Sequence, residues 1–158
     1  MNTLQFRYAE RSDIKLILHY IRELADYEKL LHEVVATEEL LEEWIFEKKK
    51  AEVIFGMEGD KEIGFALFFH NFSTFLGRAG LYLEDLYVSP EHRGKGYGKA
   101  MFKKLASIAV ERGCGRLDWW CLDWNKSSID FYLAMGAIAM DEWTVYRLEG
   151  ERLKALAK

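Results

Sequence analysis

A glycine-rich segment, "RGKGYGK" at residues 93–99, constrains this 158-residue chain more than any other feature. The "YLEDLYV" before it alternates apolar and polar side chains, which predicts a strand, and "YGKAMFKKLASIAVERG" has the apolar period of a helix. The glycines therefore lie at a turn from a strand into a helix. Because a helix N-terminus offers unpaired N–H groups and glycines let a ligand approach them, we expect an anion here, most plausibly phosphate.

Two familiar phosphate loops do not match this segment. The P-loop G-x-x-x-x-G-K-[ST] fails because Lys99 is followed by Ala100 rather than by a hydroxyl that could bind magnesium. The dinucleotide fingerprint G-x-G-x-x-G fails because the glycines at positions 94, 96 and 98 are spaced G-x-G-x-G. ATP, GTP and dinucleotide chemistry are therefore disfavoured.

The whole-chain numbers set the class of protein. A chain that is 50% hydrophobic can bury a core, and without repeats or linkers we expect a single domain over residues 1–158. The N-terminus lacks an apolar signal core and no apolar run reaches the ~20 residues of a membrane span, so we expect a cytoplasmic protein with no membrane partner. A net charge of -4 disfavours nucleic acid, and two cysteines and four scattered histidines predict no disulfide framework and no metal.

The hydrophobic patterns predict an α/β fold. "LQFRYA" is expected as a strand, Ser12 or Asp13 as the cap of a first helix and Thr37 as the start of a second. A hairpin is expected around Gly59-Asp60, then the third strand, the glycine loop and the third helix, with "RLDWWCLDW" as a strand. "SSIDFYLAMGA" is expected as a short helix, and "AIAMDEW" and "TVYRLEG" as closing strands. The order β-α-α-β-β-β-α-β-α-β-β predicts a central mixed, mostly antiparallel sheet flanked by about four helices.

The segment "VSPEHRGKGYGKAMF" resembles the acetyl-coenzyme A signature of the GNAT N-acetyltransferases, R-G-x-G-x-G. "IRELADYEKL", "YLEDLYV", "GCGRLDWWCLDWN" and "FYLAMGA" are similar to the spermidine/spermine (diamine) and thialysine acetyltransferase branch. The resemblance covers nearly the whole chain. It implies a GNAT-like fold, acetyl-CoA as co-substrate, a small-molecule amine as acceptor, and a homodimer with the C-terminal strands near its interface.

The same resemblance implies which residues bind the cofactor. The pyrophosphate would lie on the glycine loop, at Arg93, Gly94, Lys95, Gly96, Tyr97, Gly98 and Lys99. The pantetheine arm would pair as an added strand with the backbone of Leu86, Tyr87 and Val88, and Asn125 and Tyr132 would contact the cofactor.

The chemistry requires that an ammonium group of pKa near ~10.4 lose a proton before its nitrogen can attack a thioester. The resemblance implies Glu84 as general base, directly or through water, and Tyr132 as general acid for the departing thiolate. A backbone N–H near Leu86 could support the oxyanion. Since neighbouring side chains on a strand alternate, Asp85 is expected to point away from Glu84 unless a bulge rotates the strand.

The acidic surplus suits a cationic acceptor. By resemblance, the amine-side residues are Tyr27, Glu28, Glu84, Asp85, Asp118, Trp119, Trp120, Glu142 and Trp143. Without the resemblance, Tyr132 would be assigned to the core or to a half-exposed position, Glu84 to the surface, and at least one of the two adjacent tryptophans to the core.

Three functions stay open at this point. The first is direct acetyl transfer from acetyl-CoA to a small primary amine, a polyamine or diamine ahead of thialysine or another lysine-like amine. The second is acetylation of a peptide N-terminus or a protein lysine on the same fold. The third is a non-catalytic module that binds acyl-CoA without turnover.

Overall fold

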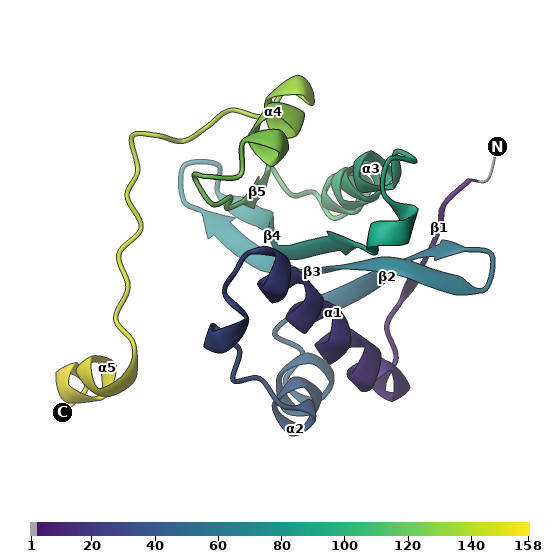
Figure 1. Cartoon of the computed structure of the whole chain (residues 1–158). Coiled ribbons are helices and arrows are strands. Elements are labelled where there is room, and N and C mark those ends of the chain that lie inside the picture. The colour runs from purple at the N-terminus through teal and green to yellow at the C-terminus, as the bar shows by residue number, and fades with distance from the viewer. Residues whose placement is uncertain (1–2) are drawn as a thin grey trace. The chain divides into compact units, whose positions relative to one another are not determined.

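A five-stranded sheet with strand order β1-β2-β3-β4-β5 forms the centre of the first part of the chain (Figure 1). The computed structural model describes residues 3–158 and divides into two units, Met1–Trp120 and Cys121–Lys158, which are described separately below. The first four strands pair antiparallel and β5 pairs parallel to β4. The strands are β1 (Gln5–Tyr8), β2 (Glu52–Glu58), β3 (Lys61–Ser73), β4 (Arg78–Val88) and β5 (Leu117–Trp119).

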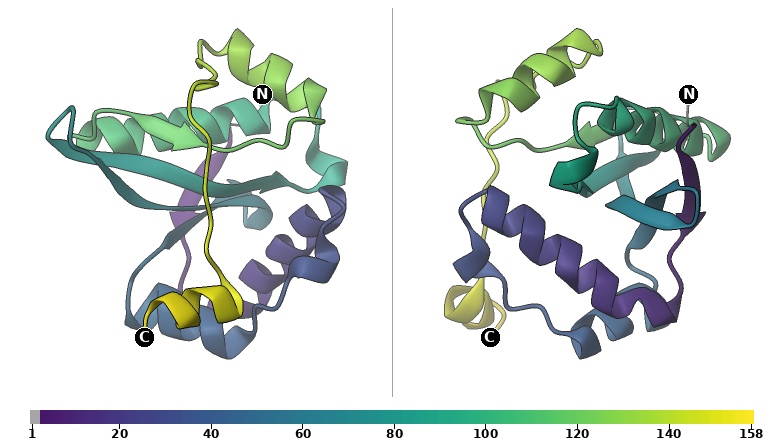
Figure 2. Two further views of the ribbon diagram at one scale, coloured as in Figure 1. Left: turned by 90° about the vertical axis from the view of Figure 1, so that its left-hand side faces the viewer. Right: turned by 45° about the vertical axis from the view of Figure 1, so that its right-hand side comes forward.

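Helices cover both faces of this sheet, as Figures 1 and 2 show, with α1 (Ile14–Tyr27) on one face and α3 (Tyr97–Glu111) on the other. Between α1 and the sheet lies a cluster of buried side chains that includes Ile17 and Tyr20 of α1 and Phe55, Phe65 and Tyr87 of the strands. Alternate strand residues face the other way, and Met101 and Leu105 of α3 are fully buried against them. The sheet is therefore an inner layer, as expected for an α/β domain.

The predicted helix starts are confirmed. Asp13 precedes α1 and its side chain accepts a hydrogen bond from the backbone N–H of Glu10 at 2.7 Å. Thr37 caps the short helix α2 (Glu38–Leu41), because its Oγ1 accepts from the N–H of Leu40 at 3.2 Å. One feature was not expected from the sequence: α2 continues as a π-helix over Glu42–Glu47.

A bulge interrupts β4 in the middle of the predicted site. Leu67 of β3 pairs with Asp85, but the next residue, Phe68, pairs with Leu83. Glu84 is therefore the extra residue of β4, with no partner of its own on β3. The exception that the sequence left open, a local rotation of the strand, is the arrangement observed.

The second unit, Cys121–Lys158, contains α4 (Lys126–Ala134) and α5 (Gly150–Leu156). The helix predicted from "SSIDFYLAMGA" is confirmed as α4. The strand predicted from "RLDWWCLDW" is only three residues long, and "AIAMDEW" and "TVYRLEG" form no strand, so the prediction of two closing strands was wrong for the described chain. Their side chains are mostly exposed, and without a neighbouring strand the backbone has no ladder to join. That residues 1–158 form a single domain stays a prediction.

Candidate functional site: a glycine loop and an acidic cluster

The glycine loop forms an open set of backbone donors at the start of α3. Gly94 and Gly96 have φ angles of 80° and 81°, which side chains with a Cβ rarely adopt. The first helical hydrogen bond runs from the N–H of Ala100 to the carbonyl of Gly96, at 3.1 Å. Among the described residues, no acceptor faces the N–H groups of residues 94–99. These donors fit a phosphate or diphosphate group.

The loop is attached to the β2–β3 hairpin by a residue that sequence reasoning missed. Glu58, at the end of β2, accepts a hydrogen bond from the hydroxyl of the buried Tyr97 and lies 3.7 Å from Nζ of Lys95. The bond from Tyr97 and the nearby lysine lower the pKa of Glu58. Its position before a tight turn gave no signal of a partner 39 residues away.

Arg93 is exposed, and its side chain also contacts protein groups. Its Nε donates to the carbonyl of Val88 at 2.9 Å, and its guanidinium carbon lies 5.5 Å from the ring centroid of Tyr27 and 5.2 Å from that of Tyr87. The side chain thus connects the loop to β4 and to the end of α1. Binding of the pyrophosphate by Arg93 stays a prediction.

One edge of β4 is open beside this loop. β3 pairs with β4 along its length, whereas β5 pairs only with residues Leu81, Tyr82 and Leu83. From Glu84 to Val88, the other edge of β4 has no partner strand within Met1–Trp120. An extended group with amide donors and acceptors could add to this edge, as was predicted for Leu86, Tyr87 and Val88.

The bulge changes which side chains share a face. Tyr82 pairs with Phe69 and Asp85 pairs with Leu67, and the two β3 residues, two apart, point to the same face. Tyr82 and Asp85 therefore share that face, although strict alternation over three residues would place them on opposite faces. The exception stated for a bulge therefore applies at Glu84 and Asp85, and the roles of both residues in the site stay predictions.

Three carboxyl groups influence one another at this point. Burial, followed by the charges of Glu84 and Glu28, raises the pKa of Asp85 to about 7. Burial also raises the pKa of Glu28, again with help from Glu84. Glu28 comes from the end of α1, so two segments more than 50 residues apart in the sequence bring their acids together. The charges that act on Glu28 and Asp85 come from other members of this group of three, which we call the acidic cluster.

Tyr82 borders the acidic cluster and was also missed by the sequence reasoning. Burial raises its pKa, and the charges of Glu84, Asp118 and Asp85 add to the shift, in that order. Its ring is 4.9 Å from that of Phe69, and Trp120 meets it edge-on at 6.0 Å. The strand position gave no hint of this, because a tyrosine in an alternating run is ordinarily a packing residue.

The two adjacent tryptophans have different surroundings. Trp119 packs against Phe102 of α3, with ring centroids 4.9 Å apart, whereas Trp120 is 59% exposed. Asp118, immediately before Trp119, forms an ion pair with Nε of Arg116 at 3.1 Å. The expectation of one core tryptophan therefore points to Trp119, and Trp120 is the one beside the acidic cluster through Tyr82.

The remaining predicted site residues belong to the second unit. Asn125 immediately precedes α4, and Tyr132 lies on α4 with its ring 5.8 Å from that of Phe131. Glu142 and Trp143 lie in the exposed stretch after α4. The roles of these four residues stay predictions.

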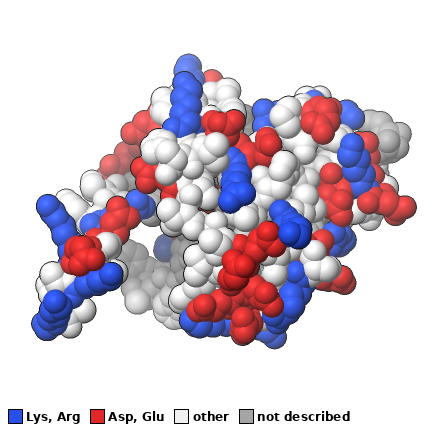
Figure 3. Space-filling model, turned by 60° about the horizontal axis from the view of Figure 1, so that its bottom comes forward, with Lys and Arg blue, Asp and Glu red and all other residues white. Residues whose placement is uncertain are grey.

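The charged surface is mixed. On the face drawn in Figure 3, a group of acidic side chains lies beside basic ones, and the basic side chains form no single area. No His, Cys, Asp and Glu side chains of residues 3–158 gather in a group of three or more that could hold a metal ion. None of the helices there is long and apolar enough to cross a membrane.

Comparison with known proteins shows which family this chain resembles in sequence and in structure. A sequence model of the acetyltransferase (GNAT) family matches residues 18–137. The chain is 39% identical to a thialysine N-epsilon-acetyltransferase from Bos taurus, covering 99% of both chains, and 30% identical to an L-ornithine N5-acetyltransferase from Arabidopsis thaliana, covering 98% of this chain and 88% of that one. Among solved structures, an integron cassette protein from the mobile metagenome of V. cholerae is 33% identical, with a TM-score of 0.81 over 100% of this chain and 99% of that one.

Proposed function

This chain belongs to the GNAT acetyltransferase family, and from that premise we propose that it transfers the acetyl group of acetyl-CoA directly to a small primary amine. The observation that carries the proposal is the acidic cluster of Glu28, Glu84 and Asp85, in which the charge of Glu84 helps to raise the pKa of the other two. A bound ammonium would supply a positive charge. Thialysine, ornithine and polyamines share this chemistry, and two of the relatives carry thialysine and ornithine in their names.

In this proposal, acetyl-CoA binds along the glycine loop and the open edge of β4. The N–H groups of residues 94–99 would receive the pyrophosphate, with Lys95 and Lys99 adding positive charge. The pantetheine amides would pair with the backbone between Leu86 and Val88, and Asn125 would contact the cofactor. When bound, acetyl-CoA supplies the activated acetyl group. No metal is part of the proposal.

Glu84 takes the proton of the substrate ammonium, directly or through a water molecule. At pH 7 this deprotonation costs roughly 4–5 kcal/mol in water, so a nearby carboxylate is useful. The exposed position of Glu84 allows it to meet an incoming amine. Tyr132 is the proposed proton donor to the sulfur of coenzyme A, and the N–H of Leu86 a donor to the oxyanion.

Tyr27, Trp120 and Asp118 are the proposed neighbours of the amine on the first unit. An aromatic face can hold a cation with ~0.5–2 kcal/mol, and Trp120 is exposed for such a contact. Trp119, which packs on α3, would support the neighbouring Trp120. Glu142 and Trp143 of the second unit are proposed as further amine-side residues.

A homodimer is part of the proposal. The stretch after α4 exposes large apolar side chains, and a soluble monomer rarely leaves so many uncovered. They include Ile138, Met140, Trp143, Val145, Tyr146 and Leu148. Pairing with a second copy would cover them and would give the two predicted closing strands a ladder to join. The cytoplasm is the proposed location.

The test is release of the coenzyme A thiol from acetyl-CoA with spermidine, spermine, putrescine, thialysine, ornithine, lysine and a short peptide. We expect release with at least one small amine, and at least a roughly tenfold lower kcat for Tyr132→Phe. Release with the peptide alone would move the acceptor to a protein. Binding of acetyl-CoA without release from any acceptor would replace the proposal with a non-catalytic binding module.

A further inference from the structure

We infer that Asp85 is the proton-holding partner of Glu84: the bulge of β4 joins the two carboxyl groups into a pair that shares one proton, and Asp85 keeps it while the amine attacks. The inference rests on the proposed function and deepens it. It differs from a mechanism in which Glu84 acts alone, because it gives the buried neighbour a part in moving the proton.

The first argument is geometric. In a regular strand, Glu84 and Asp85 would point to opposite faces and could not exchange a proton. Here Asp85 pairs with Leu67, but the next residue of β3, Phe68, pairs with Leu83, so one residue of β4 is left over. The charge of Glu84 is close enough to raise the pKa of Asp85 and that of Glu28 as well. The bulge thus removes the strict alternation that would place these two carboxyl groups on opposite faces of β4.

The second argument concerns the groups that surround Asp85. Glu28, just after α1, and Glu84, on β4, both carry charges that raise the pKa of Asp85. Asp85 in turn acts on the hydroxyl of Tyr82, together with Glu84 and with Asp118 of β5. β3 contributes the apolar Leu67 and Phe69 at this level. Every charged group that acts on Asp85 is therefore an acid. Two adjacent carboxylates in such surroundings cannot both ionise easily, so the pair favours a single shared proton.

The third argument is the division of exposure within the pair. Glu84 is exposed and can reach a substrate, whereas Asp85 is less exposed and its raised pKa of about 7 lets it accept a proton once it is ionised. A proton taken by Glu84 would therefore move to Asp85, since burial disfavours the charge there most. Passing it inward returns Glu84 to its anionic form, which keeps the substrate side of the site negative.

The acetyl transfer then needs two proton transfers from the nitrogen. The ammonium gives one proton to Glu84 and from there to Asp85, and the free nitrogen lone pair attacks the thioester carbonyl carbon. The bond between this carbon and sulfur breaks, its electron pair leaves with sulfur, and sulfur takes a proton from Tyr132. The nitrogen gives its second proton back to Tyr132 as the amide forms. One proton per turnover remains on Asp85 and leaves to solvent.

The experiment is the pH dependence of kcat/KM for the most active amine, in the wild type, Asp85→Asn, Glu84→Gln and the double variant. For the wild type we expect kcat/KM to fall at acid pH with an apparent pKa near 7, and we call this part of the profile the acid limb. Asp85→Asn should lower kcat/KM at least about tenfold at pH 7.5 and move the limb down by one pH unit or more. Glu84→Gln should also move the limb down, and the double variant should be no worse than about threefold below the poorer single variant, because the two act as a unit.

The matched control is Glu111→Gln, at the far end of α3 and about 21 Å along that helix from Tyr97. It removes one carboxylate charge and should leave the limb unchanged. A limb that stays near pH 7 in Asp85→Asn, while Glu84→Gln abolishes it, would overturn the inference and leave Glu84 acting alone. So would multiplicative losses in the double variant, which indicate two independent roles.

Folding and the underlying function are checked separately. Coenzyme A binding by each variant shows whether the fold and the cofactor loop survive. If Asp85→Asn fails to bind, Glu84→Gln decides by itself: a limb moved down supports a titrating Asp85, and a lost limb contradicts it. If the wild type releases thiol with no amine, the proposed function fails, whereas an active wild type with an unmoved limb removes only the inference about Asp85.

Discussion

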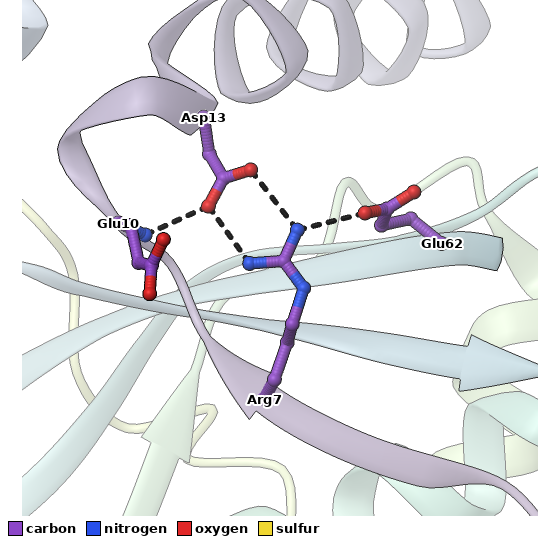
Figure 4. Close-up of polar contacts among 4 residues, drawn as sticks. All are labelled: Arg7, Glu10, Asp13 and Glu62. Atoms are coloured by element: carbon purple, nitrogen blue, oxygen red, sulfur yellow. Dashed lines mark hydrogen bonds and ion pairs between the residues drawn. The ribbon is translucent and has the colours of Figure 1, made fainter. Parts of the chain in front are cut away.

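Two groups of acids in the first unit contain the same residue types and behave in opposite ways. In the first, which Figure 4 shows, Arg7 donates to both carboxylate oxygens of Asp13, at 2.8 and 3.0 Å, and to Glu62 at 2.7 Å. The second is the acidic cluster, where the charges that act on Glu28 and Asp85 come from neighbouring acids. The hydrogen bonds from Arg7 lower the pKa of Asp13 and Glu62, whereas burial raises the pKa of Asp85 and Glu28.

The difference separates acids that support the fold from acids that await a ligand. Arg7, Asp13 and Glu62 satisfy one another and connect β1 and β3 to the start of α1. The acidic cluster gains nothing for the fold by being charged, since burial of an unpaired carboxylate is unfavourable. A cluster that costs stability and lies beside a predicted cofactor edge is best explained by a cationic substrate.

The largest expected effect comes from adding a cation as a side chain. Glu28→Lys should place an ammonium group in the acidic cluster and compete with the substrate, so kcat/KM for the amine should fall at least about a hundredfold. Coenzyme A binding should change little. Glu111→Lys makes the same charge change at the far end of α3, and steady-state kinetics of both variants would decide. Equal losses in the two would contradict a special role for the cluster.

The next effect is on stability and depends on pH. The folded-state pKa of Asp85 lies near 7, above its ordinary value of 3.8, so its contribution favours the folded state at low pH and is lost as pH rises through 7. Between pH 5 and 8 this loss is about 2–3 kcal/mol. Asp85→Asn should therefore be more stable than the wild type at pH 8 and gain less at pH 5. Urea unfolding at both pH values measures the difference in stability. An Asp85→Asn variant that is less stable than the wild type at pH 8 would contradict this prediction.

The group of Arg7, Asp13 and Glu62 should contribute to stability with the opposite pH dependence. Arg7→Met leaves Asp13 and Glu62 without their donor, so the free energy of unfolding at pH 7 should fall by about 1–3 kcal/mol. Because the lowered pKa of each acid stabilises the fold above its ordinary pKa, the difference from wild type should shrink as pH falls toward 3. Activity per folded molecule should stay within about twofold. A large loss of kcat with full stability would mean that this group serves the site instead.

The smallest expected effect concerns Glu58, an acid placed beside an anion-binding loop. In the free protein it holds Lys95 and Tyr97, so its charge competes with a phosphate for the loop. Glu58→Gln should tighten coenzyme A binding about two- to fivefold at low salt and less at high salt. Calorimetric titration measures this, with Tyr97→Phe to remove the hydrogen bond alone. Weaker binding in Glu58→Gln would assign the residue to loop structure rather than to charge competition.

Local patterns were enough for much of the fold. The apolar stripe of α1, the Thr37 cap, the hairpin and the glycine loop each depend on residues close in sequence, and all were predicted. The closing strands were not, because a strand also needs a neighbouring edge, and alternation says nothing about its presence. The short length of β5 was not predicted for the same reason.

The site was predictable in composition and not in arrangement. Glu84 and Asp85 were identified by resemblance, yet alternation placed them on opposite faces, and only the register against β3 reveals the extra residue. The approach of Glu28 to β4 depends on how the end of α1 packs, which no spacing in the sequence records. The same is true of Glu58 and Tyr97, where two long-range partners hold the loop.

The most direct measurement of the central claim is a carbon-detected NMR titration of the aspartate carboxyl groups, with and without the preferred amine. The account predicts an apparent pKa near 7 for Asp85 in the free protein, a value below 3.8 for Asp13, and a fall in the pKa of Asp85 when the amine binds. If Asp85 and Asp13 titrated together near 4, and the amine moved neither, the acidic cluster would be an ordinary surface group and the account would be wrong.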